Sequence, residues 1–382
     1  MQQNEEPDIN EILKNKKIDF IATVISPWHV FGVDAFLYKL YCKLNRRING
    51  LILIYPHSVD KNSYTVDENT FYCRNFADVN FYFKKYEEKT LGFIDSLSSA
   101  TETLHGLFNI ILNKSEGDFL YLISPLFVKL SSFKYFAHKE IDNKYKPAFI
   151  LIDEGLGTCL SKREWKLGRN KKLMNRLMDI EVESTSLFKS LNRVSLSERF
   201  LYQKKIPLEL NSDISKDYNS VLKFGNKLSS SNEKIVLILT EDYSEENILT
   251  SKEELDIIKS LIKIINGLNI RVIIKPHPVE KEDKYKNILE EFDNVKIINN
   301  GPIAEKIIPY LNPICVFGYS STALINASLL YNITSVSLIN IIISDNEKFL
   351  FYTNKFKKFS KNCIEFVNSI DEIKKFILIK NL

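Results

Sequence analysis

Apolar and β-branched residues gather in short runs along the first half of the chain, and patterns typical of helices lie between them. The runs predict strands at residues 18–25, 50–55, 79–83, 119–123 and 146–152. Residues 31–44 and a region around 91–112 have the pattern of helices. Such an alternation is typical of a mostly parallel sheet with helices on both faces.

The alternation restarts in the second half, after a polar region that extends to about residue 230. The runs there predict strands at residues 234–239, 270–274, 295–298, 313–317 and 334–339. Ser251 to Glu254 resembles a capping box, and apolar residues at helical spacing follow it. We therefore predict an α/β protein with two Rossmann-like domains facing across a cleft, residues 1–215 and residues 216–382.

Composition excludes several classes of protein. The chain has 382 residues, 45% of them hydrophobic and 26% charged, which suits a globular protein. A net charge of +4, without basic blocks interleaved with aromatic residues, argues against a nucleic-acid partner. The polar N-terminus is unlike a secretory signal, and the uncharged stretch 307–344 has too many Asn, Ser and Thr residues for a membrane span. Five cysteines without a C-x-x-C pair indicate a cytoplasmic protein with neither a zinc site nor a disulfide framework.

The first candidate site is the acidic tip that follows the predicted strand 146–152. It consists of Asp153, Glu154 and Gly155. At a strand end, neighbouring carboxylates can reach one crevice, and their repulsion raises the pKa of one of them, as a general base requires. Gly155 permits a sharp turn and a close approach of substrate. The alternative interpretation is a solvated turn in which Asp caps a helix.

The second candidate is His277, which lies between Pro276 and Pro278 at the end of the predicted strand 270–274. The two prolines stiffen the loop, so it can aim the imidazole at a phosphate. When protonated, the imidazole would offset the charge of a leaving group or give it a proton, and Lys275 adds a second cation. The alternative is a structural turn with an incidental histidine.

The third candidate is Gly318 to Thr322, where a predicted strand is followed by a helix. Ser320, Ser321 and Thr322 supply hydroxyl groups beside a helix N-terminus, which attracts anions. Simple N-capping competes with this interpretation, and both can hold together. Ser26 and His29, at the end of the first predicted strand, are further candidates for the lining of the cleft.

Motifs that the chain lacks also restrict its function. It has no P-loop, no G-x-G-x-x-G fingerprint and no G-x-S-x-G nucleophile elbow. It also has no Asp-x-Asp pair, the usual ligand of the metal that accompanies a nucleotide sugar. We therefore expect no metal site.

The three motifs, in this order, resemble those of bacterial sialyltransferases. That group has an acidic-acidic-Gly motif, a His-Pro motif and a Ser/Thr run, which here correspond to 153–155, 277–278 and 320–322. The Ser-Pro-Trp-His sequence at 26–29 resembles the polysialyltransferase-like branch, which occurs with capsule and lipooligosaccharide genes.

The resemblance implies a GT-B fold and inverting, metal-independent transfer of sialic acid from CMP-sialic acid to a glycan hydroxyl, without another cofactor. The first domain would be on the acceptor side, and the second would bind the nucleotide sugar. Asp153, or else Glu154, would deprotonate the acceptor. His277 would contact the CMP phosphate and assist its departure, and the hydroxyls of 320–322 would bind that phosphate. Lysine-rich segments at 355–361 and 373–382 could contact the inner membrane surface, although a closing helix explains the second more simply.

Two alternatives use the same residues. Teichoic-acid polymerases, which transfer glycerol phosphate from CDP-glycerol, have a similar Lys-Pro-His-Pro loop and Ser-rich helix start. A nucleotide-sugar-binding or epimerase-like protein without transferase activity is the other alternative. The acidic tip and the Ser-Pro-Trp-His sequence favour sialyl transfer.

Overall fold

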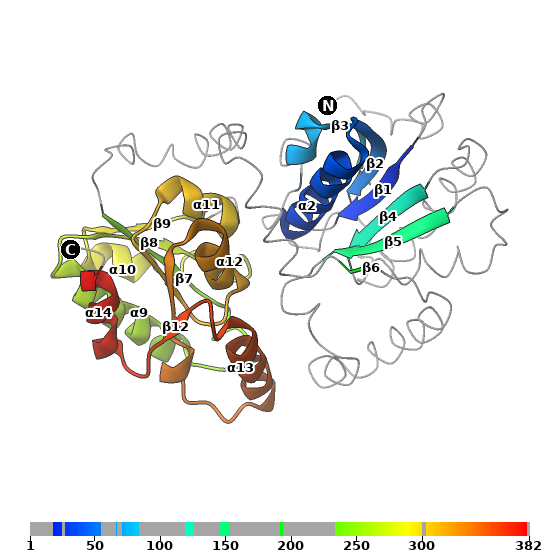
Figure 1. Cartoon of the computed structure of the whole chain (residues 1–382). Helices are drawn as coiled ribbons and strands as arrows, with labels where there is room; N and C mark the ends of the chain where they lie inside the picture. The colour runs from blue at the N-terminus through cyan, green and yellow to red at the C-terminus, as the bar shows by residue number, and fades with distance from the viewer. Residues whose placement is uncertain are drawn as a thin grey trace, which may run out of the picture. The chain divides into compact units, whose positions relative to one another are not determined.

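The computed structural model describes residues 18–24, 27–54, 66, 71–83, 119–125, 146–152, 192–193, 234–299 and 303–379. The chain divides into two compact units, Met1–Ile206 and Pro207–Leu382, and each contains a six-stranded sheet (Figure 1). The predicted division after residue 215 falls outside the described residues and stays a prediction.

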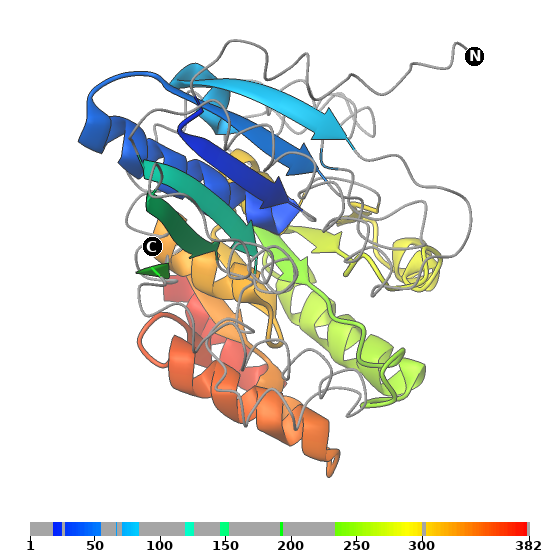
Figure 2. The same ribbon diagram turned by 90° about the vertical axis from the view of Figure 1, so that its right-hand side faces the viewer.

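The first unit is built on a parallel sheet with the strand order β3-β2-β1-β4-β5-β6. Figure 2 shows the arrows of β1, β2 and β3 pointing the same way. Its elements are β1 (Phe20–Val24), α2 (Pro27–Leu44), β2 (Ile48–Ile54), the 3₁₀ helix η2 (Tyr72–Asn75), β3 (Ala77–Phe83), β4 (Phe119–Pro125), β5 (Lys146–Ile152) and β6 (Asn192–Arg193).

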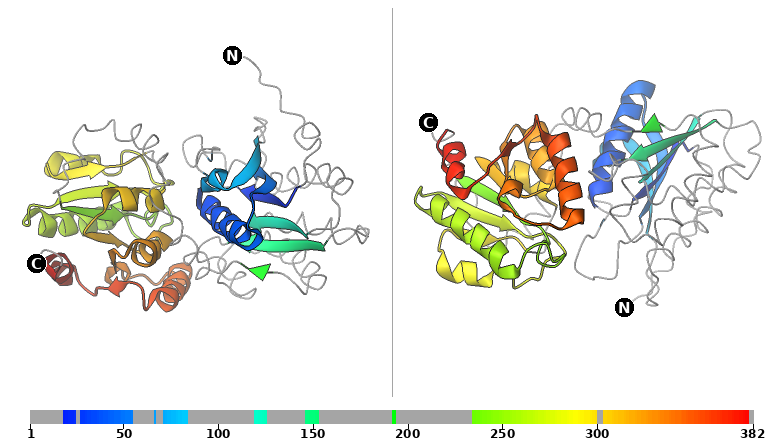
Figure 3. Two further views of the ribbon diagram at one scale, coloured as in Figure 1. Left: turned by 45° about the horizontal axis from the view of Figure 1, so that its top comes forward. Right: turned by 90° about the horizontal axis from the view of Figure 1, so that it is seen from below.

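The core of this unit lies between the sheet and α2. Phe20, Ala22 and Val24 project from one face of β1 and pack in one cluster with Val33 and Leu37 of α2. This alternation of inward positions on a strand is what its period of two residues dictates. Figure 3 shows α2 lying along the sheet.

The second unit has the strand order β12-β11-β10-β7-β8-β9, again with every neighbouring pair parallel. Its strands are β7 (Ile235–Leu239), β8 (Arg271–Lys275), β9 (Val295–Ile297), β10 (Cys315–Gly318), β11 (Thr334–Ser337) and β12 (Glu365–Phe366). Its helices are α9 (Ser251–Asn266), α10 (Lys286–Glu291), α11 (Ala304–Leu311), α12 (Thr322–Tyr331), η6 (Ile339–Ile341), α13 (Glu347–Ser360), η7 (Ile370–Glu372) and α14 (Ile373–Ile379).

Helices cover both faces of the second sheet (Figure 1). Val236 and Ile274, on one face, pack in a single cluster with Ile258 and Ile262 of α9 and with Ile377 of α14. Helices α11 and α12 lie over the opposite face. The sheet is therefore buried on both sides, which explains why its strands are continuous apolar runs.

The two sheets have the same topology. In chain order, each sheet starts at a central strand, builds outward to one side and then restarts on the other side. This order is that of a doubly wound sheet, and it puts a switch point between β1 and β4 in the first sheet and between β7 and β10 in the second. The expectation of an α/β protein with two Rossmann-like parallel sheets is confirmed.

All ten predicted strands are present, and each end lies within two residues of its expected position. Two corrections concern the starts of helices. Helix α2 begins at Pro27, not at residue 31, so His29 lies in its first turn and not in a loop. Proline suits this position because its missing N–H would have no helical partner there. The capping residue of α9 is Thr250, not Ser251, since Thr250 and Glu253 form the reciprocal bonds of the capping box.

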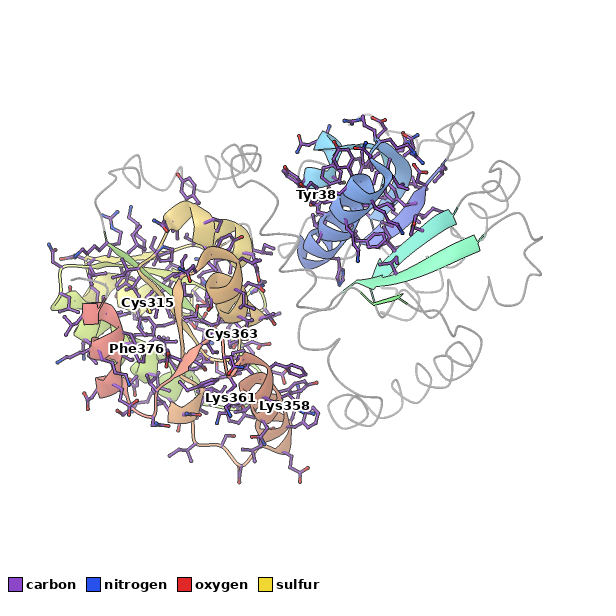
Figure 4. All side chains as sticks on the ribbon, in the orientation of Figure 1. Tyr38, Cys315, Lys358, Lys361, Cys363 and Phe376 are labelled. Carbon is purple, nitrogen blue, oxygen red and sulfur yellow. The ribbon has the colours of Figure 1, made fainter. Side chains whose placement is uncertain are left out.

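The uncharged stretch 307–344 forms parts of α11, β10, α12 and β11, as the pattern predicts. Cys315 is buried in the core and is labelled in Figure 4. Among the described residues, no helix combines the length and apolarity needed to cross a membrane.

Candidate functional site

The candidate site lies at the carboxyl edge of the second sheet, around its switch point. There β10 and β8 lie on either side of β7. Beyond the strands, Thr240 N still donates to Lys275 O at 3.3 Å. A Cβ atom on Gly318 would lie 3.0 Å from Leu239 O, so glycine permits the close approach of β10 to β7. The loops that follow β7, β8 and β10 therefore leave the sheet side by side.

The loop after β8 carries His277 in a tight turn. Glu280 N donates to His277 O at 3.0 Å, and His277 N donates to the Glu280 carboxylate at 2.6 Å. The imidazole Nδ1 is buried and has no hydrogen-bond partner among the described residues. Burial lowers the pKa of His277, although the Asp242 and Glu280 carboxylates oppose this. Burial of the imidazole therefore favours its neutral form, and an anion bound beside it would favour the protonated form that the sequence argument requires.

Glu280 is the centre of a buried network that fixes this turn. Its Oε2 accepts from His277 N and from the Thr240 hydroxyl. Its Oε1 accepts from Lys284 Nζ at 2.7 Å and from Tyr285 Oη at 2.6 Å. Through these four hydrogen bonds, the Glu280 carboxylate links the segments that follow β7 and β8. The position of His277 therefore depends on the buried Glu280 side chain.

Lys284 balances three carboxylates at once. Its Nζ lies 3.1 Å from Glu245, 2.7 Å from Glu254 and 2.7 Å from Glu280. Within the described part of the chain, these three glutamates are also the group with metal-like spacing, one oxygen of each lying within 4.8 Å of the others. Because the Lys284 ammonium contacts all three carboxylates, it occupies the position that a metal ion would take among them. Burial would lower the pKa of Lys284, but the bonds to Glu254 and Glu280 outweigh burial and raise it.

Lys275 ends β8 with its side chain buried, at 9% exposure. Its Nζ donates to Pro276 O at 3.3 Å. Burial lowers the pKa of Lys275 to about 8, and the Glu280 carboxylate opposes the shift. The Lys275 side chain is therefore mostly protonated at pH 7 and can bind an anionic group. Pro278, two positions beyond the buried Pro276, is exposed.

The three hydroxyl residues after β10 have different partners. Ser320 Oγ lies 2.7 Å from Tyr243 Oη. Ser321 is the N-cap of α12 and accepts from Ala323 N at 3.4 Å, so the capping interpretation holds for this residue. Thr322 is the first residue of the helix. All three residues are partly exposed.

The loop after β7 adds acidic residues that the sequence argument missed. Glu241 and Asp242 follow β7 as a second acidic pair at a strand end. Burial raises the pKa of Glu241 to about 8, and the carboxylates of Asp242, Glu280 and Glu254 add to the shift. The sequence pattern that could have identified Glu241 and Asp242 is the one used at 153–154, an apolar run followed by two acidic residues.

The candidates in the first unit are less completely described. His29 is buried in the first turn of α2. Ser26 and the acidic tip Asp153, Glu154 and Gly155 lie outside the described residues. The strand before the tip is present, since β5 ends at Ile152. The structure therefore brings Lys275, His277 and Ser320 to one edge of one sheet. The roles of these three residues and of the other candidates stay predictions.

Comparisons with known proteins agree with this architecture. A model of the alpha-2,8-polysialyltransferase (POLYST) family matches residues 20–340. No match was found among curated protein sequences.

Solved structures support the fold. UDP-GlcNAc 2-epimerase from Methanocaldococcus jannaschii is 12% identical, with a TM-score of 0.55 over 96% of this chain and 92% of the epimerase. The alpha/beta-galactoside alpha-2,3-sialyltransferase from Photobacterium phosphoreum is 13% identical, with a TM-score of 0.51 over 94% of this chain and all of the other, 100%. At these identities, the likeness shows a shared GT-B-like fold and nothing finer.

The family match covers most of the chain, from β1 into η6. It thus includes the first sheet, the second sheet except its edge strand β12, and the edge that carries His277. The chain belongs to the alpha-2,8-polysialyltransferase family and is a sialyltransferase with a GT-B-like α/β fold.

Proposed function

We propose that this sialyltransferase uses CMP-sialic acid as its donor and transfers the sugar, with inversion, to a hydroxyl of a capsule or lipooligosaccharide-type glycan. The observation that carries the proposal is the grouping of Lys275, His277 and Ser320 at the switch point of the second sheet. Ligands of doubly wound sheets bind at such points. An ammonium, an imidazole and a hydroxyl together suit a phosphate ester.

Each residue has a distinct task in this proposal. Lys275 compensates the phosphate charge, and Ser320 donates a hydrogen bond to a phosphate oxygen. His277 binds the leaving phosphate and donates a proton as the bond to the sugar breaks. Asp153, with Glu154 as the alternative, takes the proton from the acceptor hydroxyl. Attack on the face opposite the departing CMP inverts the anomeric centre.

Metal independence follows from the chemistry of the donor. CMP is a good leaving group, and an oxocarbenium-like centre needs a base and stabilisation of the departing anion. Lys284 already bonds to the carboxylates of Glu245, Glu254 and Glu280, so this cluster has its own cation. Cationic side chains replace a metal ion in the proposal.

A transfer assay with three donors tests the proposal. Purified protein is incubated in excess EDTA with a sialylated oligosaccharide acceptor and CMP-sialic acid, CDP-glycerol or UDP-GlcNAc. We expect a product one sialic acid heavier, with the opposite anomeric configuration, from CMP-sialic acid alone. A glycerol-phosphate product, an epimerised free nucleotide sugar, or activity that needs a divalent metal would contradict the proposal.

Helix α13 supports a second part of the proposal, a contact with an anionic membrane surface. Exposed apolar side chains, Ile343, Leu350 and Phe359, lie on α13 or just before it. Lys358 and Lys361 are exposed at its carboxyl end (Figure 4). Apolar and basic side chains together favour anionic lipid. Sedimentation with vesicles containing phosphatidylglycerol should fall in the Lys358→Glu, Lys361→Glu double variant, and equal binding would refute the contact.

A further inference from the structure

We propose that Tyr243 is a positioning residue for the donor phosphate. Its phenol donates a hydrogen bond to Ser320 Oγ, so that the Ser320 hydroxyl is oriented to donate its own proton to a phosphate oxygen. The inference rests on the proposed function, because it takes Ser320 as a phosphate ligand. Tyr243 itself contacts Ser320 and not the phosphate.

The location of the pair supports this role. Tyr243 lies in the loop after β7, and Ser320 lies in the loop after β10. These strands are neighbours in the sheet although they are far apart in the chain. The 2.7 Å hydrogen bond between the two hydroxyls therefore spans the switch point. Ser320 is a partly exposed residue, so a ligand that binds at this edge can reach it.

The phenol of Tyr243 is held in place by its ring. The ring packs against Tyr319, with centroids 5.2 Å apart, and against Phe349 edge-on, with centroids 5.6 Å apart. Tyr243 is 6% exposed. Burial raises its pKa well above the usual value, and the neighbouring Glu241 carboxylate adds to the shift, while the bond to Ser320 opposes it. The phenol thus keeps its proton at any pH suitable for an assay.

The chemistry of the two hydroxyls sets the direction of the bond. A phenol is more acidic than an aliphatic alcohol, so it is the better donor and the serine oxygen the better acceptor. When an anion approaches Ser320, the serine proton turns toward it, and Oγ can then only accept from Tyr243. Donation by the phenol polarises the serine O–H bond and strengthens its bond to the anion.

The Ser320 loop does not need Tyr243 for its backbone conformation. Ser337 Oγ donates to Tyr319 O at 2.5 Å, and Leu338 N donates to Gly318 O at 2.8 Å. These two bonds attach the segment on either side of Tyr319 to β11 and the residue after it. The hydroxyl of Tyr243 is thus free to act on the serine side chain.

A double-mutant cycle on the full chain tests the inference. CMP affinity is measured by titration calorimetry for wild type, Tyr243→Phe, Ser320→Ala and the double variant. Phenylalanine keeps both ring contacts, and circular dichroism with thermal unfolding checks that each variant is folded. The matched control is Tyr331→Phe, which removes another hydrogen-bonded phenol, on a partly buried residue. The Tyr331 hydroxyl donates to Glu305 O at 2.8 Å.

We expect Tyr243→Phe to weaken CMP binding about 3- to 10-fold, the effect of one hydrogen bond, and to have no further effect in the Ser320→Ala background. Tyr331→Phe should bind CMP like wild type. Unchanged affinity in Tyr243→Phe, an equal loss in the Ser320→Ala background, or an equal loss in Tyr331→Phe would overturn the inference. Failure of wild type to bind CMP would instead refute the proposed donor, and this inference with it.

Discussion

Replacing Glu280 by glutamine removes the charge at the centre of the network that fixes His277. The carboxylate accepts from four donors: Thr240, His277 N, Lys284 and Tyr285. Glutamine keeps one acceptor oxygen and places an NH₂ group where the second oxygen was. Two of the donors therefore lose their acceptor, whichever way the amide is turned.

The size of the effect follows from these contacts. A buried donor without a partner costs about 1–3 kcal/mol, and loss of one partner from a buried ion pair costs about 3–5 kcal/mol. Lys284 keeps Glu245 and Glu254, and Tyr285 can rotate its hydroxyl, so the loss should be smaller than the sum. We expect Glu280→Gln to lower the free energy of unfolding by about 2–4 kcal/mol, or the unfolding midpoint by roughly 5–15 °C.

Differential scanning calorimetry of the full chain measures this effect, with Glu291→Gln as the matched control. Glu291 forms surface ion pairs with Lys259 and Lys263, and such pairs contribute about 0–1 kcal/mol. Its replacement should shift the midpoint by no more than a few degrees. If the two variants unfold at the same temperature, the claim that the Glu280 carboxylate stabilises the fold through its four hydrogen bonds is wrong.

Three further predictions follow from the site. Asp153→Ala should abolish sialyl transfer, measured by chromatography of a labelled acceptor, while CMP affinity stays near wild type; unchanged turnover would exclude Asp153 as the base. CMP affinity by calorimetry should fall between pH 7 and pH 9, because Lys275, with a pKa of about 8, is charged below that pH and neutral above it; the fall should be smaller in Lys275→Met, and an equal fall would exclude the lysine. Lys284→Met leaves the carboxylates of Glu245, Glu254 and Glu280 without their shared cation, and it removes the contacts that lower the pKa values of Glu245 and Glu254 in the folded state. Urea unfolding should therefore show a loss of stability at pH 8 that is smaller at pH 5, and a larger loss at pH 5 would contradict the network.

The strands were predictable because each is a short β-branched run that a buried parallel sheet requires. Strand β5 occupies residues 146–152 as expected, and β7 differs from its expected range by one residue. The position of His277 was predictable for the same reason, since a loop that follows a buried strand emerges at the carboxyl edge. Local errors arose where two residues could both cap a helix, as with Thr250 and Ser251.

The contacts within the site were not predictable, because they depend on strand order. Nothing in the local sequence places β10 beside β7, so the Tyr243–Ser320 bond could not be foreseen. The Glu280 network also breaks the rule that charged residues lie outside, and it is stable only because several donors converge from three segments. A buried ionic network of this kind is only weakly indicated by the sequence. The one indication here is the spacing of four residues between Glu280 and Lys284, which permits an ion pair.

The central claim is that CMP binds at the carboxyl edge of the second sheet, between the loops that follow β7, β8 and β10. Hydrogen–deuterium exchange of the full chain, with and without saturating CMP in EDTA, tests it directly. We predict slower exchange in peptides covering residues 240–243, 275–280 and 318–324, and loss of this protection in His277→Ala. Protection confined to other segments, or the same protection in His277→Ala, would contradict the account.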